Sequence, residues 1–165
     1  MKTSTKTLLA SASVLLLTTL HHFYGALLYK TPWRNHVALI ALPVLLVLVV
    51  THEIHRRQPA TPLGRGSLFL LAALTLAVPV GMIGIFEGGY NHLVKDLLFF
   101  GGLPASAFDR LFPDSVYEMP DDLLFEASGV LQFFLGLYTA RSLARLWRER
   151  SLEQSGRTEE DRQAA

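Results

Sequence analysis

Four long apolar segments constrain the fold of this 165-residue chain more than any other feature of its sequence. They cover, in rounded limits, residues 7–29, 37–53, 67–87 and 123–147. A helix needs roughly 20 apolar residues to cross the hydrocarbon core of a bilayer. In lipid, every backbone N–H and C=O must be satisfied within the segment, and a helix achieves this. We therefore predict an all-α, integral membrane four-helix bundle in residues 1–150 and a polar disordered cytoplasmic tail in residues 151–165.

Positively charged residues are concentrated in alternate loops, and this bias predicts the orientation of the bundle. Most of them lie in the N-terminal tail, the second loop and the C-terminal end: Lys2, Lys6, Arg56, Arg57, Arg65, Arg141, Arg145, Arg148 and Arg150. We expect both termini to be cytoplasmic in a multi-pass protein of the cell membrane, with the bacterial inner membrane as its location. The first segment is expected to be an uncleaved anchor, because no small-x-small cleavage site follows it.

The outer connection between the third and fourth segments is long and acidic. Within it, the polar and apolar positions of residues 91–100 (NHLVKDLLFF) follow a helical period. We predict that these residues form a short amphipathic interfacial helix on the membrane surface. Two glycines, Gly101 and Gly102, follow it and are expected to end it. A second short helical turn is expected in residues 106–112.

The chain contains no cysteine, which limits its chemistry. A disulfide framework, a thiolate metal site, a thiol redox motif and covalent c-type haem attachment are excluded. His, Asp and Glu are left as the strong metal ligands. The net charge of +1 gives no general attraction to nucleic acid. The expected partners are the lipid bilayer and either an apolar, lipid-like substrate or a larger membrane complex.

Histidine and glutamate residues from three segments are predicted to meet near the outer membrane face. His21 and His22 lie within the first segment, about 13 Å below its flank, and titratable residues at that depth are functional candidates. Glu87 ends the third segment, His92 follows it, and Glu126 opens the fourth. We expect His21 or His22 to come within about 8 Å of the side chains of Glu87, His92 and Glu126, which should lie equally close to one another. In this hypothesis the three histidines bind a metal. The two glutamates are catalytic acid–base groups.

Neutral imidazole and carboxylate ligands suit Zn, Fe or Cu, and haem is an alternative cofactor. The spacing matches no familiar metal motif, because there is neither an HExxH sequence nor a Glu-x-x-His pair. Adjacent residues point about 100° apart on a helix, so His21 and His22 are not expected to bind the same mononuclear ion. Asp96 lies one helical turn after His92 and is a candidate to orient its imidazole.

The glutamates also have a purely structural interpretation. Charges inside a membrane need partners, and Glu87 and Glu126 can pair with Lys95, Arg34 or a histidine across the bundle. Histidines near helix ends, such as His36, more often make local hydrogen bonds than bind metal.

The sequence leaves open whether the chain is an enzyme. The preferred hypothesis is metal-dependent or acid–base chemistry on an apolar substrate. The alternative is a non-catalytic accessory or assembly subunit of a larger membrane complex. A transporter is disfavoured, because polar residues are absent from the middles of the second and third segments. A stripe of small residues predicts a close helix–helix seam: Ala73, Ala77, Gly81, Gly84 and Gly88.

Overall fold

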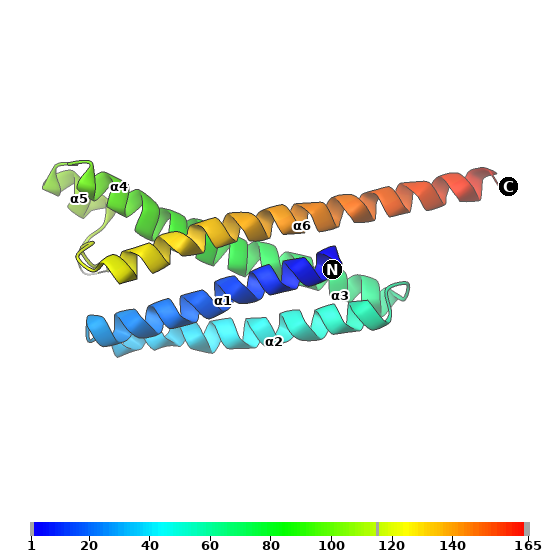
Figure 1. Ribbon diagram of the computed structural model, residues 1–165, viewed down its shortest axis with the longest axis horizontal. Coiled ribbons are helices and arrows are strands. Elements are labelled where there is room, and N and C mark those ends of the chain that lie inside the picture. Colours follow the sequence, from blue (N-terminus) through cyan, green and yellow to red (C-terminus); the bar gives the residue numbers. More distant parts are fainter. Residues whose placement is uncertain (1, 115, 164–165) are drawn as a thin grey trace.

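The computed structural model describes residues 2–114 and 116–163, with side chains described up to Leu152 and at Ser155. Its elements are α1 (Thr3–Leu28), η1 (Pro32–Asn35), α2 (His36–Arg57), α3 (Pro62–Thr75), η2 (Leu76–Val94), α4 (Lys95–Phe100), α5 (Ala105–Leu111) and α6 (Leu123–Gln163). No strand occurs among the described residues. The all-α prediction is confirmed, and Figure 1 shows the long helices lying lengthwise in an elongated bundle.

Four stretches of helix are long and apolar enough to cross a membrane: Thr3–Leu28, Pro32–Arg57, Pro62–Phe100 and Leu123–Leu152. They agree with the four predicted segments in number and order. Both chain termini point toward the same end of the bundle in Figure 1, as an even number of crossings requires. Insertion into a membrane and the cytoplasmic location of the termini stay predictions.

The third stretch is one continuous helix made of α3, η2 and α4. Its middle part, η2, is a π-helix, in which each N–H bonds to the carbonyl five residues earlier. The short helix predicted for residues 91–100 is therefore not separate, because η2 runs into α4 without a break. Lys95, expected on an exposed polar face, is only 2% exposed because it pairs with a carboxylate inside the bundle. The second predicted turn corresponds to α5.

Small residues bring η2 and α6 into close contact. A Cβ atom placed on Gly84 would lie 2.8 Å from the Cα of Gly136, and one on Gly136 would lie 2.5 Å from the Cα of Gly84. Gly88 lies equally close to the backbone of α6 at Gly129 and Phe133. Gly84 and Gly88 of the predicted stripe therefore pack against another helix, whereas Ala73 and Ala77 are exposed. α6 fills the face at Gly84 and Gly88.

Buried alcohols also join α1 to its neighbours. Thr7 Oγ1 lies 3.0 Å from Ser142 Oγ on α6, and Ser11 Oγ lies 3.3 Å from Thr75 Oγ1 on α3. Lipid tails are as apolar as the side chains that face them, so the hydrophobic effect does little to hold helices together in a bilayer. Close packing at glycines and hydrogen bonds between buried alcohols hold the helices together instead.

α6 stays helical through Gln163, although the sequence predicts a disordered tail from residue 151. The last part of α6 is rich in Glu, Gln and Arg, which are good helix formers. Polarity alone therefore does not distinguish a disordered tail from an extended helix. The division of the chain into a bundle and a tail stays a prediction.

We expect Gly136→Ala to destabilise the protein by about 1–3 kcal/mol, because the new methyl group would push η2 away from α6. Gly66→Ala is the matched control: it lies within α3, and a Cβ atom there meets nothing within 4 Å. The control should leave stability unchanged or raise it by about 0.5–1 kcal/mol. Thermal unfolding in detergent measures both variants. Equal melting temperatures for the two would contradict the seam.

Candidate functional site

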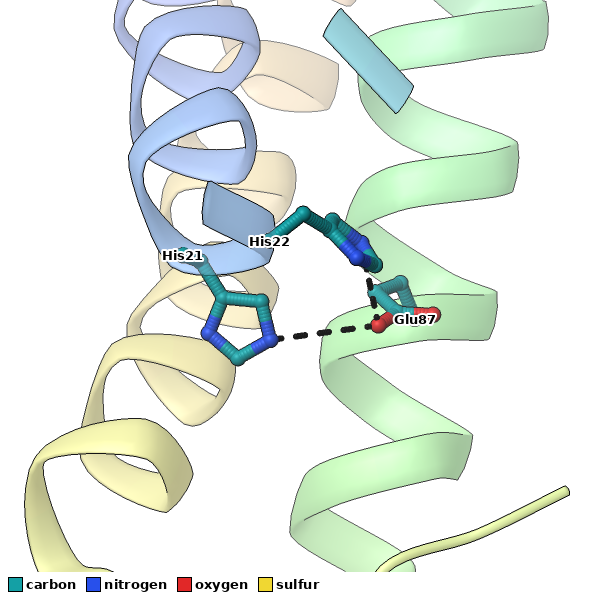
Figure 2. A group of neighbouring side chains, drawn as sticks. All are labelled: His21, His22 and Glu87. Atoms are coloured by element: carbon teal, nitrogen blue, oxygen red, sulfur yellow. Dashed lines mark ion pairs between the residues drawn. The ribbon is translucent and has the colours of Figure 1, made fainter. Parts of the chain in front are cut away.

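Three imidazoles surround one carboxylate oxygen inside the bundle. Glu87 Oε1, on η2, lies 3.4 Å from His22 Nε2, 3.7 Å from His92 Nε2 and 4.0 Å from His21 Nε2. Figure 2 shows the two histidines of α1 reaching toward Glu87 across the gap between the helices. The predicted His/Glu cluster is therefore present. It joins α1 and η2 at one level of the bundle.

His21 and His22 reach the same carboxylate despite being adjacent, which the sequence did not predict. Their rings are nearly perpendicular, with centroids 5.1 Å apart. One ligand atom from each of His21, His22 and Glu87 lies within 4.8 Å of the other two. The directions of adjacent side chains differ by about 100°, but the long histidine side chains bend toward a partner placed between those directions. The structure thus brings both residues to one carboxylate, although they were not expected to bind the same mononuclear ion.

The π-helix explains how Glu87 and His92 share a face. Residues five apart lie on different sides of an α-helix, but the wider π-helix brings them to the same side. Asn91 adds to this arrangement, because its Nδ2 donates a 2.7 Å hydrogen bond to Glu87 Oε2. That bond fixes the carboxylate so that its other oxygen, Oε1, faces the imidazoles.

A second carboxylate orients His92 from α6. His92 Nδ1–H donates to Glu126 Oε2 at 2.6 Å, and Lys95 Nζ donates to Glu126 Oε1 at 2.8 Å. Glu126 is 5% exposed, so this contact between His92, Glu126 and Lys95 is buried. In the neutral imidazole this bond places the proton on Nδ1, and His92 Nε2 then presents a lone pair toward Glu87. Glu126, and not Asp96 as predicted, is the partner that orients His92.

His21 is held in the same way by Ser128 of α6. The Ser128 hydroxyl donates to the backbone oxygen of Phe125 at 2.9 Å, so its oxygen accepts from His21 Nδ1–H at 2.9 Å. The ring of His21 also stacks on Phe125, with centroids 4.2 Å apart. His21 Nε2 is therefore an unprotonated, buried nitrogen without a hydrogen-bond partner among the described residues. Its lone pair faces the cluster.

A cleft of about 340 Å³ opens beside the cluster, between α2 and η2. Its walls are mainly apolar, and its polar lining includes His22, Glu87, Asn91 and His92. Three residues of the loop before α6 complete it on the outer side: Val116, Tyr117 and Glu118. A mostly apolar pocket with a few convergent polar groups is typical of ligand sites.

The outer loop is fastened over this end of the bundle. Arg34 NH2 donates to Glu118 Oε1 at 3.0 Å, and Lys95 Nζ donates to the backbone oxygen of Glu118 at 3.0 Å. Tyr29 donates to Asp121 Oδ1 at 2.9 Å, and burial together with this carboxylate raises the pKa of the Tyr29 phenol. The loop is thus tied to η1, to the end of α1 and to α4.

The other histidines lie elsewhere. His36, which is exposed, contacts the backbone oxygen of Trp33 at 2.6 Å. At the opposite end of the bundle, His52 Nε2 lies 3.2 Å from Thr5 Oγ1 and His55 Nδ1 lies 3.0 Å from the backbone oxygen of Gly64. Each therefore has a local hydrogen bond, as expected for His36.

We expect Glu126→Gln to destabilise the protein by about 3–5 kcal/mol, because Lys95 would stay buried without its counter-charge. Removing that charge as well, in a Glu126→Gln/Lys95→Met variant, should restore part of the loss. Glu53→Gln is the control and should change little, since Glu53 pairs with Arg56 and Arg57 on the surface. Chemical unfolding in detergent gives the three values. A loss for Glu126→Gln no larger than for Glu53→Gln would contradict a buried charge network.

No protein-family model matches this chain, and comparisons with curated proteins and with solved structures found no similar protein. The function is therefore argued from the geometry of the cluster and the cleft.

Proposed function

We propose that this chain is a polytopic membrane protein that binds one transition metal ion at its His/Glu cluster. The ligands are Nε2 of His21, His22 and His92, together with Glu87 Oε1. One observation carries the proposal: two of the three imidazoles use Nδ1 for another partner and turn Nε2 toward Glu87 Oε1. In the neutral rings, the Nε2 lone pairs and the anionic oxygen repel one another, and a cation between them removes this repulsion.

The distances support an ion of ordinary size. Four nitrogen and oxygen ligands at roughly 2.0–2.2 Å from a metal in tetrahedral geometry are about 3.3–3.6 Å apart. The three Nε2 atoms lie 3.4–4.0 Å from Glu87 Oε1. His21, His22 and Glu87 also place one ligand atom each within 4.8 Å of one another, and His92, which is outside that group, would have to move closer to the other two histidines. Zn, Fe and Cu all accept this ligand set, and imidazole with carboxylate does not select among them.

The surroundings of the ligands also resemble those of metal sites. Metal-binding imidazoles usually donate their other N–H to a carboxylate, a hydroxyl or a carbonyl, which fixes the ring and makes it more basic. Glu126 and Ser128 serve His92 and His21 in this manner. Glu126 is not among the residues that line the cleft, so we assign it to positioning His92. Glu87 is a ligand in the metal site and is the acid–base group only in the metal-free alternative.

A metal bound here would act as a Lewis acid or lower the pKa of a bound water. The chain itself supplies the cleft, whose apolar walls would hold an apolar molecule beside the cluster. A metal-free acid–base site is the second candidate, and it is favoured by His22 and Glu87, which both face the cleft. An accessory subunit would need neither the metal nor the cleft.

Metal content tests the proposal directly. Purified protein, supplied in turn with Zn, Fe and Cu, should hold about one equivalent of metal per chain by mass spectrometry, because the cluster provides a single four-ligand site. His22→Asn should lose most of it, since His22 Nδ1 has no hydrogen-bond partner and its removal disturbs the fold least. His36→Asn is the control, because His36 lies outside the cluster, and it should keep its metal. Glu126→Gln should weaken metal affinity about 10–100-fold.

A wild-type protein that takes up no metal would overturn the metal proposal, and so would equal metal loss in the His22 and His36 variants. In the first case, a substrate-dependent activity abolished by Glu87→Gln would favour acid–base chemistry. Co-purification with a larger complex would favour the accessory subunit.

A further inference from the structure

The cleft beside the cluster carries unused hydrogen-bonding capacity. Three of its lining residues have a buried polar atom without a hydrogen-bond partner among the described residues: Thr18 Oγ1, His22 Nδ1 and Asn91 Oδ1. Thr18 is only 1% exposed. A buried polar group left unpaired destabilises a protein by about 1–3 kcal/mol, so three in one cavity need an explanation.

The chemistry of these atoms defines the head that they would bind. Asn91 Nδ2 donates to Glu87, so Asn91 Oδ1 is an acceptor and requires a donor from the ligand. The Thr18 hydroxyl can donate or accept. The two cations that line the cleft are already paired, Arg34 with Glu118 and Lys95 with Glu126. An uncharged hydroxyl matches this set. A phosphate has no free counter-charge, and Glu87, the carboxylate that an ammonium group would need, is already held by Asn91 and faces the imidazoles.

The rest of the cleft is built for a hydrocarbon chain. Its apolar lining includes Ile40 and Val37 of α2 and Val78, Met82 and Phe86 of η2. Ile40, Met82 and Phe86 are 47–56% exposed and lie within candidate membrane spans. Their open sides would therefore face lipid. At the end that carries the loop before α6, Glu118 is held by Arg34 and Lys95, so a ligand would come from the bilayer and not from water.

We infer that the cleft binds a single-chain amphiphile with an uncharged, hydroxyl-bearing head, such as a long-chain alcohol. The hydroxyl lies at Thr18 and Asn91, and the chain leaves between α2 and η2. A water takes up about 30 Å³ of liquid volume, so 340 Å³ holds roughly eleven atoms of that size. The head and the first part of the chain fill the cleft, and the remainder lies in the bilayer. The amphiphile is then the ligand of the site proposed above. Any reaction of the amphiphile depends on the proposed metal or acid–base chemistry, but its binding in the cleft does not.

The fluorescence of a tryptophan in the protein can report binding in the cleft. Trp33 lines the cleft, whereas the second tryptophan, Trp147, lies beside Arg150 at the opposite end of the bundle. In a Trp147→Phe background, within phosphatidylcholine nanodiscs, a brominated long-chain alcohol should quench Trp33 fluorescence with a saturable component. A brominated alkane of the same length has no hydroxyl. It should produce only the linear quenching expected from partitioning into the bilayer.

Two adjacent threonines provide a matched pair of variants. Thr18→Val removes the unpaired hydroxyl and should weaken alcohol binding about 3- to 10-fold, the value of one hydrogen bond. Thr19→Val is the control, because Thr19 Oγ1 already donates to the backbone oxygen of Leu15 and does not line the cleft. Thr18→Val should not lower the melting temperature of the free protein, since it removes an unsatisfied group.

Equal saturable quenching by the alcohol and the alkane would overturn the assignment of the head. Equal weakening in the two threonine variants would overturn the contact with Thr18. An absence of saturable quenching would overturn the binding site itself. Metal content measured on the same samples separates the two proposals: metal with no alcohol binding contradicts only the ligand, and alcohol binding with no metal contradicts only the metal centre.

Discussion

A charge buried in a membrane helix must have a partner, and this constraint organises the outer half of the bundle. Lys95 pairs with Glu126, Glu126 accepts from His92, and His92 approaches Glu87. This chain of contacts alternates between the third helix and α6, and Glu87 extends it to the histidines of α1. Removal of any one of these side chains would leave the charge or hydrogen-bonding group of its neighbour without a partner. The cluster is therefore both the candidate reaction centre and the polar core that fixes three helices relative to one another.

The conformation of η2 makes this arrangement geometrically feasible. A π-helix is wider than an α-helix and packs its own backbone less tightly, so it is usually found as a single turn and often at functional sites. Here it extends over 19 residues that include Pro79 and several glycines. Pro79 cannot donate a backbone hydrogen bond, and the glycines let α6 approach the widened helix. Irregular backbone is tolerated within a membrane where other helices cover it.

The sequence was sufficient for the helix content, the four apolar stretches, the seam at Gly84 and the approach of a first-helix histidine to Glu87 and His92. The hydropathy of the segments predicts the helices, and the position of the polar residues at the segment ends predicts which side chains meet. It was insufficient for the π-helix, because polar positions such as Asn91 and Lys95 were projected with the α-helical period. Asp96 was assigned to orient His92 for the same reason, although Glu126 was already expected as a possible partner of Lys95 or of a histidine across the bundle. Ser128 and Thr18 could not have been identified, since a lone alcohol on an apolar helix gives no signal until its neighbours are known.

Lys95 has two acceptors, and they belong to different parts of the protein. One is the carboxylate of Glu126, and the other is the backbone oxygen of Glu118 in the outer loop. A molecule that lifts this loop from outside would deprive the ammonium of one acceptor and draw it more strongly toward the other. Glu126 would then accept less strongly from His92, and the imidazole would become a weaker base. A change in the loop at Glu118 would therefore alter the basicity of His92 Nε2 through Lys95 alone, without any movement of a helix.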